Sequence, residues 1–182
     1  MILDLGEYQL GPSNARLRLR TYRRGFARSV GHDLVLVAGR WSGTVVAGAS
    51  PADSLVSGWV DIDSLVIAEA AGGVMALSDR DRADLDAELR KQRGVKDYPR
   101  ATFRSSAITA TDDEASVEGL FTVRGAAAPL TLKVARTASG TFTVTAVVVQ
   151  TAHGIKPFSA FLGALKQRDE VDVEIEIDLM TT

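Results

Sequence analysis

The chain has 182 residues, a formal net charge of −2 and no cysteine. It is long enough to bury a substantial core, and the missing cysteines exclude disulfides and thiolate metal sites. A dedicated nucleic-acid-binding protein would normally be strongly basic, so the charge balance argues against that class. We expect residues 1–182 to form a single domain.

Membrane and export signals are not evident in the sequence. No apolar run approaches the roughly 20 residues that a transmembrane helix needs. The first residues, Met1-Ile2-Leu3-Asp4, lack the basic region and the long apolar stretch of a secretory signal. We therefore expect a cytoplasmic protein without a transmembrane segment.

Strands dominate the pattern of the chain. Apolar and polar residues alternate over long runs, as in strands with one solvent-exposed face. In chain order, the predicted strands are 15–22, 32–48, 55–67, 100–109, 115–124, 129–136, 141–152 and 171–179. Gly39 and Gly43 fall inside the second run and leave open its division into two strands. Eight antiparallel strands closed into a barrel would leave an interior that side chains fill or that holds one small ligand.

One helix is predicted between the strands, as an insertion at about 78–94. Ser78 is a suitable N-cap and Gly94 a suitable stop, while Leu85 and Leu89 share one face. A lone helix between strand-like runs indicates an all-β protein with one insertion rather than an alternating α/β fold. We expect the helix to cover one mouth of the barrel.

The connections differ in length between the two ends of such a barrel. Connections at one mouth are 23–31, 68–99, 125–128 and 153–169, and three of these four are long. The connections at the other mouth, 49–54, 110–114 and 137–140, are all short. Function tends to lie on elaborated loops. A ligand is therefore expected to enter at the mouth with the long loops.

Basic residues near the start of the chain divide into two groups. Arg16, Arg18 and Arg20 lie on the polar face of the first strand, and barrel closure would place them beside the acidic face of 171–179. Opposite charges on neighbouring strands stabilise pairing modestly. We predict a ligand-headgroup role for residues at the long-loop mouth, namely Arg23, Arg24, Arg28, His153, Lys156 and Phe158.

Several short motifs in order resemble the YceI-like family. They include Tyr98-Pro99, Phe103-Arg104-Ser105 and Gly119-Leu120-x-Thr122, and the family usually carries a histidine at the position of His32. The resemblance implies a lipocalin-like barrel that binds polyisoprenoids without catalysing a reaction. It implies the same fold as the pattern of strands: an eight-stranded antiparallel barrel with a helix at one mouth.

The apolar faces of the strands predict a cavity. Aromatic residues make up only 6% of the chain, so a wall of mainly valine and leucine is expected to leave open volume for a lipid tail. The predicted lining residues are Leu17, Leu19, Leu34, Leu36, Val60, Ile62, Phe103, Phe121, Val123, Val144, Val173, Ile175 and Ile177.

The leading hypothesis is binding, and carriage, of a long-chain isoprenoid or similar amphiphilic lipid, with a hydrophobic small molecule as partner and no nucleic acid. It requires no catalytic residue, metal or cofactor. Two alternatives stay open: an enzyme on the same barrel that uses His32 or His153, and a solid-core stress-response or interaction module. The oligomeric state is also open, a homodimer included.

Overall fold

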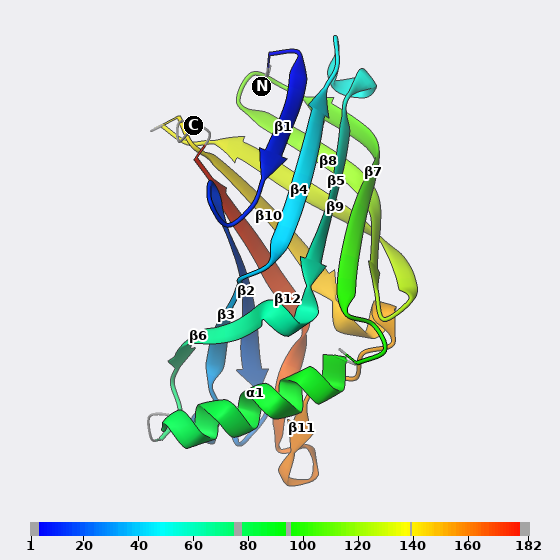
Figure 1. The fold of residues 1–182 in the computed structure, drawn as a ribbon. Helices are drawn as coiled ribbons and strands as arrows, with labels where there is room; N and C mark the ends of the chain where they lie inside the picture. The colour runs from blue at the N-terminus through cyan, green and yellow to red at the C-terminus, as the bar shows by residue number, and fades with distance from the viewer. Residues whose placement is uncertain (1–3, 75–77, 94–95, 139, 179–182) are drawn as a thin grey trace.

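The computed structural model describes residues 4–74, 78–93, 96–138 and 140–178. Within these residues it contains one 12-stranded antiparallel sheet and one α-helix. The sheet curls into a half-barrel around an apolar interior (Figure 1). The prediction of an all-β fold with one helical insertion is confirmed.

The strand order across the sheet is β1-β4-β5-β7-β8-β9-β10-β12-β2-β3-β6, with β11 paired to β12. The strands are β1 (Gly6–Leu10), β2 (Ala15–Arg24), β3 (Asp33–Ala38), β4 (Trp41–Ala47), β5 (Leu55–Asp61), β6 (Leu65–Ala71), β7 (Arg100–Ala110), β8 (Glu114–Val123), β9 (Ala126–Arg136), β10 (Phe142–Val149), β11 (Ser159–Ala160) and β12 (Leu165–Ile177). The sheet therefore has two edges, at β1 and β6.

The prediction of eight strands is wrong, because two predicted strands each divide. The run 32–48 becomes β3 and β4, and the run 55–67 becomes β5 and β6, with the 3₁₀ turn η3 (Ile62–Ser64) between them. The halves of each run have different neighbours: β3 pairs with β2 and β6, whereas β4 pairs with β1 and β5. The strands β1 and β11 were not predicted.

Hydrogen bonds hold the two bends against each other. The Arg40 amide donates to Ser64 Oγ (2.9 Å), and this hydroxyl donates to the Asp61 carbonyl (2.7 Å). The Gly39 amide donates to the Ser64 carbonyl (3.1 Å). Arg40 Nε also donates to the Asp61 carboxylate (3.1 Å), which favours its charged form and lowers the pKa of Asp61.

The predicted pairing of the first and last long strands is confirmed. β2 and β12 are antiparallel neighbours, with Leu17 opposite Ile175 on the inner face. On the outer face Arg18 lies 3.3 Å and Arg20 3.5 Å from the Glu174 carboxylate. These ion pairs lie where the alternation of charges predicts them.

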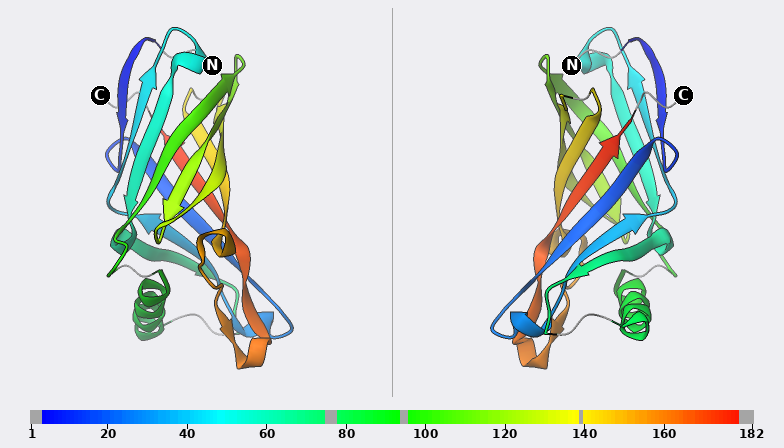
Figure 2. Two further views of the ribbon diagram at one scale, coloured as in Figure 1. Left: turned by 90° about the vertical axis from the view of Figure 1, so that its right-hand side faces the viewer. Right: turned by 90° about the vertical axis from the view of Figure 1, so that its left-hand side faces the viewer.

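The helix α1 (Asp79–Arg93) lies across the lower end of the sheet, against β6 and η3 (Figures 1 and 2). Ser78 caps it: its hydroxyl accepts from the Asp81 amide (3.2 Å), and the Asp81 carboxylate accepts from the Ser78 amide (3.0 Å). Leu85 packs against the core, and Arg90 pairs with Asp63 of η3.

Some predicted features fall beyond this description. Gly94 and Leu179 lie outside the described residues, and so does the side chain of Leu89. In the part of the chain that is described, no helix combines the length and apolar character needed to cross a membrane.

Candidate functional site

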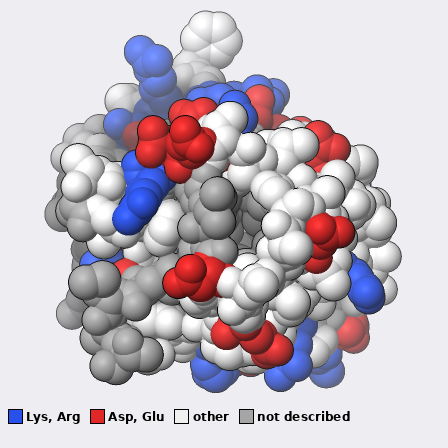
Figure 3. All heavy atoms as spheres, turned by 90° about the horizontal axis from the view of Figure 1, so that it is seen from above, with Lys and Arg blue, Asp and Glu red and all other residues white. Residues whose placement is uncertain are grey.

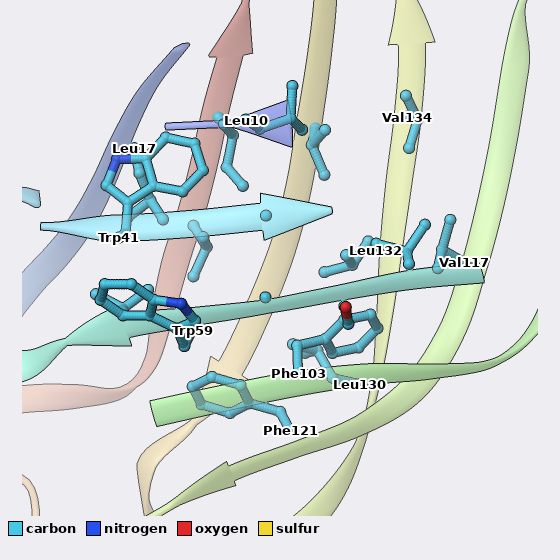
Figure 4. Close-up of a pocket in the computed structure, with 18 of the residues that line it drawn as sticks. Leu10, Leu17, Trp41, Trp59, Phe103, Val117, Phe121, Leu130, Leu132 and Val134 are labelled. Carbon is cyan, nitrogen blue, oxygen red and sulfur yellow. The ribbon is translucent and has the colours of Figure 1, made fainter. Parts of the chain in front are cut away.

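An apolar cavity of about 530 Å³ lies inside the curled sheet (Figure 4). Leucine, valine, isoleucine and aromatic side chains from both halves of the sheet form most of its wall. The cavity exists because successive side chains of a strand point to opposite faces, so each strand supplies alternate apolar residues to the inside.

All of the predicted lining residues lie on the cavity wall. Except for Ile62 of η3, they come from strands that form one sheet, with pairs such as Leu19 opposite Val173 and Phe103 opposite Phe121. The register places the apolar members of each pair on the same face. Strand alternation was therefore sufficient to locate this part of the wall.

Further wall residues were missed. Figure 4 shows Trp41 close to Leu17, with Leu130 and Leu132 of β9 on another part of the wall. The same alternation over 129–136 could have found the β9 residues. Trp41 could not be placed in this way, because it begins β4 directly after the bend that sequence alone did not locate.

The cavity extends along the barrel between its two ends. At the lower end, where the long connections gather, Thr21, Gln150 and Gln167 line it. At the upper end, Ser50 and Pro51 of the turn between β4 and β5 line it. Seen from above, uncharged residues surround a hollow near the centre of this end, with charged side chains mostly around the outside (Figure 3).

His153 is buried beside the cavity wall and does not line the cavity. It lies in the 3₁₀ turn η4 (Gln150–His153) and is only 5% exposed. Its Nδ1 is 3.0 Å from the Ala126 carbonyl oxygen, and its ring meets Phe121 edge-on at 5.3 Å between centroids. These contacts make His153 a support for Phe121.

The other predicted headgroup residues also lie away from the described cavity wall. Arg23 pairs with the Asp33 carboxylate at 3.8 Å, and its guanidinium donates to the Gly31 carbonyl. Arg24, Arg28 and Lys156 are exposed at the lower end, and Phe158 is half-buried. The structure places all of them at the long-loop end but does not gather them around the cavity.

The two histidines of the alternative enzyme prediction lie away from the cavity in the described part of the chain. His32 is absent from the described cavity wall, as is His153. Among the same described residues, no group of three or more His, Cys, Asp or Glu side chains is arranged to hold a metal ion. The polar groups that do face the cavity are hydroxyls and amides, which can orient a ligand by hydrogen bonds.

Comparison with known proteins gives a consistent picture of the fold. Residues 8–179 match the family described as the YceI-like domain. The structure is similar to BcnA of Burkholderia cenocepacia, with a TM-score of 0.64 and 18% identity over 90% of this chain and 94% of that chain. It is also similar to a Campylobacter jejuni YCEI protein, with a TM-score of 0.55 and 15% identity over 78% and 81% of the two chains. None of the curated proteins compared with the chain matches it.

Proposed function

Since this chain belongs to the YceI-like family, we propose that it binds and carries an isoprenoid or similar long-chain amphiphilic lipid inside its half-barrel. The family and its structural relatives support a ligand-binding β-barrel fold. The observation that carries the proposal of a long-chain lipid ligand is the apolar cavity of about 530 Å³. Its volume lies within the range of small-molecule sites.

The form of the cavity favours a chain-like ligand. It runs from Thr21 and Gln167 at the lower end to Ser50 at the upper end, with an apolar wall between them. A flexible hydrocarbon chain can follow such a space and bury its apolar wall. Burial of apolar surface contributes a favourable free energy of about 25 cal/mol for each Å² removed from water. The hydroxyl and amide groups at the ends suit a small polar head.

A cavity-filling substitution tests the proposal. In Val173→Trp the larger ring would occupy the cavity, so binding of a fluorescent prenyl probe to delipidated protein is expected to weaken at least about tenfold. The matched control is Val147→Trp, because Val147 lies on the neighbouring strand β10 and is 51% exposed on the outer face. Circular dichroism of both variants checks that they fold.

Wild-type protein purified without detergent provides a second measurement. Native mass spectrometry is expected to detect a co-purified lipid that disappears in Val173→Trp. The proposal fails if the wild type neither carries a lipid nor binds the probe, or if both tryptophan variants bind the probe as the wild type does.

The alternatives receive less support. The cavity argues against a solid-core module. An enzyme that uses His32 or His153 stays a prediction, and neither side chain lines the described cavity. The cytoplasmic location stays a prediction, and the oligomeric state, a homodimer included, stays open.

A further inference from the structure

Two connections form a common tip at the lower end of the barrel (Figures 1 and 2). One follows β2, and the other contains the 3₁₀ turn η5 (Phe161–Gly163) between β11 and β12. The Ala27 amide donates to the Ala164 carbonyl (2.9 Å). The backbone of Arg24 in β2 lies opposite that of Lys166 in β12. Residues 25–30 and 161–164, called the tip below, are therefore held side by side.

The tip exposes apolar side chains that the rest of the chain does not cover. Phe26 is 100% exposed and Leu162 109% exposed, and Val30 is 46% exposed. Leu162 also has a left-handed backbone, with φ of 53°, where glycine or asparagine would be less strained. Neither burial within the chain nor backbone preference accounts for a leucine there.

Basic side chains accompany these apolar residues. The segments 23–31 and 154–168 contain no Asp or Glu, although the whole chain has a net charge of −2. Among the described residues, none of the basic residues Arg24, Arg28, Lys156 and Lys166 forms an ion pair. The adjoining carboxylate of Asp33 pairs with Arg23. The tip and the segments next to it therefore combine exposed apolar side chains with a local excess of positive charge.

We propose that the tip docks on the surface of an anionic lipid bilayer, with Phe26 and Leu162 inserted at the level of the headgroups. Apolar insertion and attraction between basic side chains and anionic lipids together give interfacial binding. A projecting tip of separate apolar residues suits a bilayer better than a protein partner, which usually buries a broad packed patch. The proposal does not depend on a lipid in the cavity, but docking would bring the cavity to a source of lipid.

Flotation with vesicles tests this proposal. We expect the full-length wild type to float with vesicles of equal parts phosphatidylcholine and phosphatidylglycerol, and to float much less with phosphatidylcholine alone. Phe26→Ser and Leu162→Asn are each expected to reduce the partition coefficient at least about tenfold, because each removes an inserted apolar side chain. Leu162→Asn should keep its stability, since asparagine tolerates the left-handed backbone.

Leu120→Ser is the matched control, because Leu120 is 53% exposed on β8 and lies outside the tip. It is expected to float as the wild type does. The proposal is overturned if the wild type binds neither kind of vesicle, or if Leu120→Ser loses as much binding as Phe26→Ser. It is also overturned if Phe26→Ser abolishes a concentration-dependent dimer while the wild type shows no flotation, because the tip would then bind a second copy of the chain.

The cavity variant separates this proposal from the proposed function. Val173→Trp is expected to float as the wild type does even when it no longer binds the prenyl probe. If Val173→Trp loses flotation while Phe26→Ser keeps it, vesicle binding acts through the cavity and the docking proposal fails.

Discussion

Gly119 lies buried in the middle of β8, where its neighbours leave no space for a side chain. A Cβ atom at this position would contact the Arg104 carbonyl oxygen and lie 2.6 Å from a ring carbon of Phe103. The glycine thus lets the Phe103 ring lie against β8 on the cavity wall. At Gly43, by contrast, a Cβ atom would lie no closer than 3.5 Å to its neighbours.

Gly119→Ala is therefore expected to lower the free energy of unfolding by about 1–3 kcal/mol, because Phe103 or the β7 backbone must shift. Gly43→Ala is the matched control and should change it by less than about 1 kcal/mol. Urea denaturation of both variants measures the difference. Equal stabilities would show that the sheet absorbs the extra methyl group at Gly119 without strain.

For single residues, the sequence predicted which side chains face the cavity better than it predicted which side chains contact each other. Period-two alternation was sufficient to place Leu17, Phe121 and Ile175 on the cavity wall. It could not predict that His153 packs against Phe121 or that Gly119 lies against Phe103, because those contacts depend on strand register and on a turn between distant segments.

Among the elements, the two bends decide how the sheet is assembled. The bend between β3 and β4 allows the run 32–48 to pair with β2 in its first half and with β5 in its second half. Ser64 lies at the centre of this arrangement, is only 6% exposed, and bonds to both bends through its hydroxyl. The strand runs were evident in the sequence, but the places where two of them divide were not. Where a strand changes its neighbours depends on the positions of the other strands in the sheet, which a local sequence pattern does not contain.

Ser64→Ala is expected to lower the free energy of unfolding by about 1–3 kcal/mol, because it removes the bonds that the buried hydroxyl makes to the Arg40 amide and to the Asp61 carbonyl. Hydrogen exchange at the Arg40 amide should become faster in the same variant. Ser106→Ala removes a single exposed hydrogen bond of 3.3 Å and serves as the control, with a change below about 0.5 kcal/mol. An unchanged exchange rate at Arg40 would contradict the role given to Ser64.

At the scale of the whole molecule, the cavity occupies much of the interior, beside a packed cluster that includes Leu36, Trp41 and Ile62. No large side chain among the described residues is less than 2% exposed. Composition predicted this property, because few aromatic rings were available to fill the interior. The ends of the cavity were less predictable, since the turn of Ser50 and Pro51 looked like a plain short connection but lines the cavity.

A ligand that fills this space should stabilise the protein strongly. At a free concentration of about 100 times its Kd, a long prenyl alcohol is expected to add about 2.7 kcal/mol and to raise the Tm of delipidated protein by roughly 5–10 °C. Scanning calorimetry measures the shift, and an alcohol of a single isoprene unit is the control. No shift, or the same shift with the short alcohol, would contradict binding of a long chain in the cavity.

The two edges of the sheet have a mechanical consequence. The hydrogen-bonded path runs from β1 to β6 and, within the described residues, these two strands do not pair with each other. A closed β-barrel has a fixed diameter, because widening it would break hydrogen bonds between neighbouring strands. A wall with a seam can widen by changing its twist while every pair of strands stays bonded. Because hydrogen bonds join the two bends, this freedom is confined to the parts of the edges away from them, where we expect the cavity to accept ligands of different thickness without local unfolding.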